Sequence, residues 1–137
     1  MTLYRKPLPR PLDGELTAPF WEAARRHELI IPRCTLCNFY FWYPRQECPR
    51  CLQPGWQWEQ ATGKGRLHTF TVVRQPANPA FTDDVPYAYA VVQLDEGPRI
   101  VSNMVQCDVE DLKVDMRVEA HFDDVSPEWT LVKFKPA

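Results

Sequence analysis

Four cysteines between positions 34 and 51 are the residues of this sequence best suited to chemistry. Cys34 and Cys37 form one Cys-x2-Cys pair, Cys48 and Cys51 form another, and ten residues separate the pairs. A two-residue gap lets both sulfurs of a pair face the same point, so two pairs can surround one tetrahedral ion. Four protein thiolates leave no position for water, so we expect structural Zn²⁺ and not a Lewis acid. Iron also accepts four thiolates and stays open as the alternative.

The fifth cysteine and the N-terminal segment bear on the compartment. An odd number of cysteines, five in all, argues against a disulfide framework. The first sixteen residues, "MTLYRKPLPRPLDGEL", include basic side chains but no apolar stretch of a secretory signal. We therefore expect a cytoplasmic protein in which Cys107, which has no cysteine partner nearby in sequence, is a small buried hydrophobe.

A run of five aromatic residues, from Phe39 to Tyr43, lies between the cysteine pairs. In an extended strand Phe39, Phe41 and Tyr43 project to one side, and Tyr40 and Trp42 project to the other. A zinc ribbon has one small core, so one face of the run needs a second cover. The rest of the chain or another molecule could provide that cover, and the sequence leaves both possibilities open.

Three arginines, Arg33, Arg45 and Arg50, flank the aromatic run. A guanidinium group can hold phosphate oxygens in bidentate fashion. It can equally solvate the ribbon surface and offset the negative charge of metal-bound thiolates. The sequence alone does not decide between these roles.

The rest of the chain predicts a mainly β protein in three parts. Residues 1–28 read as a proline-rich arm followed by a helix from about 18 to 28, with Thr17 as its cap, Pro19 in its first turn and His27 on its apolar face. Residues 29–61 read as a rubredoxin-like zinc ribbon that begins with the short strand "LIIPRC". Residues 62–137 contain five short strands, which we expect to be antiparallel and to form an OB-fold barrel.

The five strands are predicted from alternating apolar residues and turn signals. Their expected ranges are 65–75, 88–95, 99–106, 116–123 and 129–134. In the fourth, Val118, Ala120 and Phe122 share one face, which predicts a half-buried strand. The segment 95–97 predicts a tight turn, and "PANPAFTDDVP" predicts a long loop between the first two strands.

Residues that could support catalysis by the chain alone are few and scattered. The two serines, Ser102 and Ser126, lie outside any nucleophile-elbow sequence. Three histidines are far apart in sequence, and "GKG" lacks the spacing of a phosphate-binding loop. The adjacent carboxylates Asp83 and Asp84 lie on the long loop. We expect no self-sufficient enzyme.

Charge and hydropathy limit the remaining functions. No run of eighteen apolar residues occurs, so we expect no membrane span. Residues 1–61 hold eight basic and six acidic side chains, whereas residues 62–137 hold eight basic and twelve acidic ones. Zinc ribbons and OB barrels both bind single-stranded nucleic acid, which makes such a module the alternative function. A barrel segment with a net charge of −4 opposes this alternative.

The order of these motifs resembles one known family over nearly the whole chain. The motifs are "FWEAARRHELIIPRC", the cysteine pairs with "YPRQECPRC", then "GKGRLHTFTVV", "VPYAYAVVQLDEG", "IVSNMV" and "LKVDMRVEAHF". They resemble the zinc-ribbon and OB-fold family of acyl-CoA-associated proteins formerly filed as a domain of unknown function. The resemblance implies an accessory subunit in a hetero-oligomer with a thiolase-fold enzyme, such as a thiolase, an acyltransferase or a steroid side-chain aldolase, in lipid or steroid degradation. The partner would carry the catalytic residues.

The resemblance also assigns roles to residues of this sequence. Cys34, Cys37, Cys48 and Cys51 match the metal positions, and Tyr43-Pro44-Arg45 matches an aromatic-proline-arginine step of the ribbon. The implied contacts with the partner or with acyl-CoA are Arg33, Phe39, Tyr40, Trp42 and Arg45. Asn38 and Leu52 stand where glycine often follows a knuckle's second cysteine. Leucine tolerates a left-handed backbone poorly, which makes the geometry of the second knuckle an open question.

Overall fold

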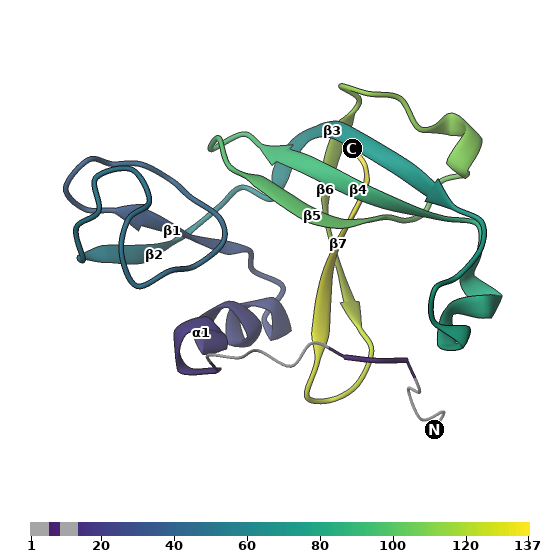
Figure 1. Ribbon diagram of the computed structural model, residues 1–137, viewed down its shortest axis with the longest axis horizontal. Helices are drawn as coiled ribbons and strands as arrows, with labels where there is room; N and C mark the ends of the chain where they lie inside the picture. The colour runs from purple at the N-terminus through teal and green to yellow at the C-terminus, as the bar shows by residue number, and fades with distance from the viewer. Residues whose placement is uncertain (1–5, 9–13) are drawn as a thin grey trace.

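The computed structural model describes residues 6–8 and 14–137 (Figure 1). Most of the proline-rich arm expected at the start of the chain lies outside these residues. The described chain contains helix α1, a two-stranded ribbon and a five-stranded barrel. Figure 1 shows the ribbon and the barrel side by side, with α1 between them along one edge. No helix in the described part of the chain is long and apolar enough to cross a membrane.

Helix α1 spans Gly14–Arg25, so the expected range of 18 to 28 is wrong at both ends. Thr17 lies inside the helix and is buried, so it is not the cap, and Pro19 lies inside the helix and not in its first turn. The helix ends because His27 adopts a left-handed φ of 61°. Its N–H donates to Ala24 O and the N–H of Glu28 donates to Ala23 O, each at 2.9 Å, which is the pattern of a Schellman motif. His27 therefore lies beyond the helix and not on its apolar face.

The ribbon pairs strand β1, Ile30–Cys34, with strand β2, Trp56–Gln60. The two strands are antiparallel, from Ile30 opposite Gln60 to Cys34 opposite Trp56. The strand expected at "LIIPRC" is confirmed. The partner strand lies 22 residues further on, at the other end of the segment that carries both cysteine pairs. The ribbon thus brings the start and the end of that segment together.

The barrel contains the five predicted strands, and its closed order is β3-β4-β5-β7-β6. They are β3 (Lys64–Val73), β4 (Tyr87–Leu94), β5 (Arg99–Met104), β6 (Arg117–Asp124) and β7 (Thr130–Pro136). The expectation that all pairs are antiparallel is wrong, because β5 and β7 run parallel and share the pair Met104–Phe134. Directions cannot alternate around a closed ring with an odd number of strands, so one pair must be parallel.

The connections follow the predicted turn signals with one addition. Gly97, with a φ of 121°, closes the turn between β4 and β5, and its N–H donates to Leu94 O at 2.9 Å. The long loop between β3 and β4 is not wholly irregular, since it contains the short 3-10 helix η1, Pro79–Asp84. Asn78 precedes η1, and its side chain accepts a hydrogen bond from the Ala80 N–H at 2.9 Å.

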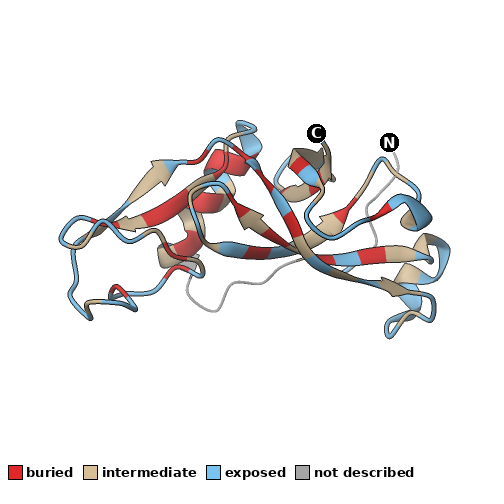
Figure 2. Cartoon of the chain, turned by 90° about the horizontal axis from the view of Figure 1, so that it is seen from above, coloured by how far each residue is buried: buried red, intermediate tan, exposed pale blue. Residues whose placement is uncertain are grey.

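One apolar core joins the three parts of the chain. The fully buried side chains of the barrel include Leu67, Val92, Val118 and Phe134. Figure 2 shows buried residues in the helix as well as in the strands. The same cluster includes Phe20 of α1, Leu29, Ile31 of β1, and Ala61. Burial of such side chains is the main favourable contribution to folding. The helix and the ribbon are therefore held against the barrel by a shared interior.

Candidate metal centre and the adjoining groove

The four paired cysteines converge on one point of the ribbon. Their sulfur atoms all lie within 4.8 Å of one another. Across the two pairs, Cys34 Sγ lies 3.6 Å from Cys51 Sγ, and Cys37 Sγ lies 3.7 Å from Cys48 Sγ. Zn–S bonds of about 2.3 Å in a tetrahedron place sulfurs about 3.8 Å apart. The donor set therefore fits structural zinc.

The two knuckles around this point share one backbone pattern. The N–H of Asn38 donates to Cys34 O at 3.0 Å, and the N–H of Leu52 donates to Cys48 O at 2.9 Å. Asn38 and Leu52 both have a φ of 62°. The second knuckle thus keeps the geometry of the first, although a left-handed leucine costs about 1–2 kcal/mol. The side chain of Leu52 avoids further crowding because it is 67% exposed.

Backbone N–H groups donate hydrogen bonds to the sulfurs and so favour the thiolate form that binds a metal. The N–H of Cys37 lowers the pKa of Cys34 to about 6, helped by the N–H of Leu36 at 3.4 Å. The N–H of Gln53 also acts to lower the pKa of Cys51, but burial and the neighbouring sulfurs raise it to about 12. Four thiolates this close would repel one another without a cation. Ionisation of all four is therefore coupled to binding of the metal.

The aromatic run, considered above as an extended strand, is not a regular strand in the structure. Within it, Tyr40 makes an isolated bridge to Arg33. Phe41 is buried among the cysteines, at 3% exposure, and Tyr40 and Trp42 pack against the main core. Phe39 and Tyr43 stay 36% and 55% exposed. The chain itself thus covers three of the five rings and leaves two at the surface.

A polar network fixes two of the predicted contact residues within the ribbon. Arg33 Nη1 donates to Glu59 Oε1 at 3.0 Å, and the Tyr40 hydroxyl donates to Glu59 Oε2 at 3.0 Å. The Tyr40 hydroxyl and then the Arg33 guanidinium hold the pKa of Glu59 below its usual range. The Arg33 guanidinium also lies 5.3 Å from the centre of the Tyr40 ring. Both residues are thus already engaged in holding β1, β2 and the aromatic run together.

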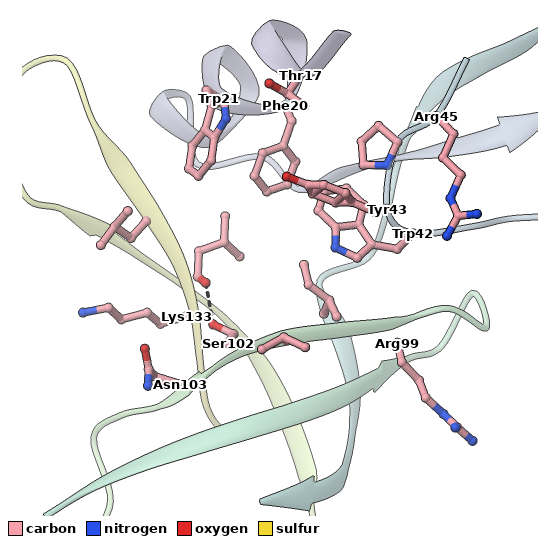
Figure 3. Close-up of a pocket in the computed structure, with 15 residues that line it drawn as sticks. Thr17, Phe20, Trp21, Trp42, Tyr43, Arg45, Arg99, Ser102, Asn103 and Lys133 are labelled. Atoms are coloured by element: carbon pink, nitrogen blue, oxygen red, sulfur yellow. Dashed lines mark hydrogen bonds between the residues drawn. The ribbon is translucent and has the colours of Figure 1, made fainter. Parts of the chain in front are cut away.

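A groove of about 620 Å³ adjoins the aromatic run, between α1, residues 42–45, β5 and β7 (Figure 3). We refer to it as the β5 groove. Its apolar lining includes Phe20, Trp21, Trp42, Tyr43, Val101 and Leu131. Figure 3 shows Arg45 and Arg99 at one end and Asn103 and Lys133 at the other. The hydroxyl of Ser102 donates to Val132 O at 2.6 Å and links the two strands across the groove.

The five predicted contact residues do not all line one hollow of the described chain. Trp42 and Arg45 line the β5 groove, whereas Phe39, Tyr40 and Trp42 line a neighbouring hollow of about 730 Å³ that Arg50 and Arg99 also line. The Arg50 guanidinium is 5.5 Å from the centre of the Phe39 ring. Arg99 also lines the β5 groove but was not predicted to belong to a site. A lone arginine after a turn gives no signal for such a role, because the groove is assembled from segments far apart in sequence.

Among the residues considered for catalysis, His27 has a structural partner. His27 Nε2 lies 2.9 Å from Asp124 Oδ2, and the Thr130 hydroxyl donates to Asp124 Oδ1 at 2.5 Å. The Thr130 hydroxyl and then His27 hold the pKa of Asp124 below its usual range. This cluster joins the end of α1 to β6. The Thr130 hydroxyl points to the carboxylate and not to the imidazole, so His27 does not act as its base.

Two family models cover most of the chain. Residues 21–57 match the rubredoxin-like zinc ribbon domain of ChsH2, and residues 58–123 match the C-terminal OB-fold domain of ChsH2. These matches confirm the predicted fold. Together with the sulfur geometry, they also confirm structural zinc as the metal that this ribbon is suited to bind.

Curated relatives include both short and long proteins. A DUF35 domain-containing scaffold protein of Methanothermobacter thermautotrophicus is 35% identical over 105 residues, which cover 76% of this chain and 78% of that protein. A probable enoyl-CoA hydratase alpha subunit of Thermomonospora curvata is 35% identical over 129 residues. That alignment covers 94% of this chain but 40% of the relative, so the chain spans less than half of that longer protein.

Solved structures agree with these relatives. A chain of an Ltp2-ChsH2(DUF35) aldolase superposes with a TM-score of 0.82 at 34% identity, and the match covers 93% of this chain and 98% of that one. A DUF35 protein of unknown function from Sulfolobus solfataricus superposes with a TM-score of 0.62 at 13% identity, covering 90% and 87% of the two chains, which shows a shared fold. By sequence and by structure, this chain belongs to the DUF35 family and has the zinc ribbon and OB-fold domain of the ChsH2 type.

Proposed function

We propose that this chain is an accessory subunit that binds a thiolase-fold enzyme and forms one side of its acyl-CoA site. The observation that carries the proposal is the superposition on nearly a whole chain of the Ltp2-ChsH2(DUF35) aldolase. In this proposal the partner supplies the reactive groups, and this chain supplies a rigid surface. All three parts of the chain contribute to the proposed function, because the β5 groove is lined by residues of 1–28, 29–61 and 62–137.

The ribbon offers the surface that we assign to the partner. Leu36 and Leu52 on the two knuckles are 66% and 67% exposed, and Phe39 and Tyr43 are also exposed. The shared knuckle hydrogen bonds and the metal hold these side chains in place, which lowers the entropy cost of binding. Exposed apolar and aromatic side chains on a fixed backbone are typical of protein interfaces.

The β5 groove offers the surface that we assign to acyl-CoA. Its walls are mainly apolar, and Arg45 and Arg99 provide positive charge at one end. Of the contacts implied by the family resemblance, Trp42 and Arg45 take part directly in this proposal, with Phe39 beside the partner. Arg33 and Tyr40 act indirectly, because their bonds to Glu59 hold the aromatic run in position.

Single-stranded nucleic acid is the competing ligand, since the barrel is an OB fold and exposed rings could stack on bases. The net charge of −4 in residues 62–137 opposes it. A gel-shift titration with a mixed-sequence oligonucleotide at low salt separates the two functions. We expect no shift at micromolar protein, and a tight complex would favour the nucleic-acid function.

Affinity purification of the tagged chain from its own host tests the accessory role. We expect a thiolase-fold protein in stoichiometric amount, identified by mass measurement. Leu36→Asp should lower its recovery about tenfold or more, because a charge would be buried at the interface. Val114→Asp is the matched control, since Val114 is also exposed, at 57%, but lies in the turn before β6, outside the ribbon. Recovery of a lone monomer from the host would refute the proposal.

A further inference from the structure

A second hollow of about 530 Å³ continues the β5 groove toward η1. Its apolar lining includes Phe81, Tyr87, Tyr89 and Met104, and the rings of Phe81 and Tyr87 lie 6.3 Å apart. Asn103, Leu131 and Lys133 line both the groove and this hollow. The two are therefore one trough that follows β5 from Arg99 to Met104. We refer to the second part as the η1 hollow.

The trough carries free positive charge at one end. Arg45 and Arg99 are exposed, and no carboxylate pairs with either of them among the described residues. At the other end both cations are already paired: Lys133 Nζ lies 2.6 Å from Asp123 Oδ2, and Lys6 Nζ lies 2.6 Å from Asp84 Oδ2. The surface available to a ligand is thus cationic beside the ribbon and apolar beside η1.

This polarity fits an elongated ligand that is anionic at one end and apolar at the other. The six residues of β5 extend over about 20 Å. A compact anion would contact only the arginines, and a free apolar group would contact only the η1 hollow. The reverse orientation would place an anion against Asp84 and rings, where like charge and burial both oppose it.

We propose that acyl-CoA lies lengthwise along β5, with its phosphates between Arg45 and Arg99 and its acyl group in the η1 hollow. This assignment rests on the proposed function and adds an orientation to it. The thioester then lies over the middle of the trough, near Ser102 and Asn103. The reactive groups of the partner must approach the trough at that point, and the hollow beside η1 limits the size of the acyl group.

Two substitutions separate the two ends of the trough. Arg99→Gln removes one phosphate contact, and Tyr89→Ala opens the η1 hollow; both side chains are exposed, so the fold should persist. Lys113→Gln is a control for charge, since Lys113 is exposed and lies outside both lined regions. Val114→Ala is the corresponding control for an exposed apolar residue.

Binding is measured by tryptophan fluorescence of the full chain, and of its purified complex, titrated with CoA and with octanoyl-CoA. We expect Arg99→Gln to weaken both ligands by about tenfold, because a charge-assisted contact is lost. Tyr89→Ala should weaken octanoyl-CoA by about threefold to tenfold and leave CoA unchanged. The control variants should match the wild-type chain.

Three outcomes overturn the assignment. They are the absence of saturable binding to both the chain and the complex, an equal effect of Tyr89→Ala on both ligands, and no effect of Arg99→Gln on either. If the partner co-purifies but one of these outcomes is found, the accessory role stands and the orientation is wrong. If the ligands behave as expected but no partner is recovered, the orientation stands and the accessory role is wrong.

Discussion

Replacing one metal ligand tests how much of this fold depends on the zinc cluster. Cys51→Ser removes one sulfur from a set that lies within 4.8 Å. Cys107→Ser is the matched control, because Cys107 lies in the barrel half outside the cluster and is partly exposed, as Cys51 is. The expectation that Cys107 is buried is therefore wrong, although it packs against the main core. Both changes replace sulfur by oxygen with little change in volume. We expect the first to unfold the ribbon and the second to leave it intact.

The expected magnitude follows from what else holds the ribbon. Its own core contains Phe41 and two of the cysteines as its buried side chains, with Trp56 packed beside them. Burial of one phenylalanine contributes about 1.5–3 kcal/mol. Structural zinc in small ribbons contributes about 10–16 kcal/mol, which is comparable to the stability of a whole domain. The free energy lost with the metal is therefore larger than the contribution of any apolar contact inside the ribbon.

Metal analysis and hydrogen exchange give the readouts. The wild-type chain and Cys107→Ser should each bind about one zinc per chain, whereas Cys51→Ser should bind much less. Amides of residues 34–55 should lose protection in Cys51→Ser, while those of β3, β4 and β6 should keep most of theirs. Full zinc content together with unchanged protection of residues 34–55 in Cys51→Ser would refute the reasoning.

Three further predictions concern stability. Leu52→Gly should raise the free energy of unfolding by about 1 kcal/mol, because glycine adopts the φ of 62° without strain. Leu36→Gly should lower the free energy of unfolding by about 0.5–1 kcal/mol, and denaturant titration of both variants checks the sign. Gly65→Ala should lower it by about 1–3 kcal/mol, since a Cβ there would meet the Gln93 carbonyl oxygen, and a barrel as stable as wild type by thermal melting would contradict this. Because the pKa of Glu59 is lowered in the folded chain, its carboxylate stabilises the fold above the unfolded pKa of about 4.3. The wild-type chain should therefore have a higher Tm than Glu59→Gln at pH 7, and this difference should disappear as the pH falls below about 4. A difference that grows in acid would contradict the prediction.

The elements predicted most accurately were those with a local signal. Cysteine spacing located the metal cluster, and alternation located all five barrel strands to within two residues at every end. The end of α1 was missed because His27 takes the left-handed conformation that glycine usually provides at this position. The parallel pair of β5 and β7 was missed because strand direction depends on barrel closure, which is a property of all five strands together.

The candidate site was less predictable because it is assembled from distant segments. Trp42 and Arg45 could be named from their place beside the cysteines. Arg99 and Leu131 lie in the same groove, but 54 and 86 positions beyond Arg45. No periodicity relates such positions. The barrel and its packing against the helix decide which of them meet.

The metal is linked to the groove through the backbone, although the ion site itself is not part of the groove. The Phe39 carbonyl accepts from the N–H of Cys34 at 2.9 Å, and the N–H of Phe41 donates to Pro32 O at 3.1 Å. These two bonds fix the chain just before Trp42, which forms a wall of the β5 groove. The ring centres of Trp42 and Phe20 lie 4.8 Å apart. Unfolding of the knuckles would release that wall together with the exposed rings of the ribbon. If the proposed function holds, a zinc-depleted chain should therefore lose binding of both the proposed partner and acyl-CoA, while retaining a barrel that is otherwise folded.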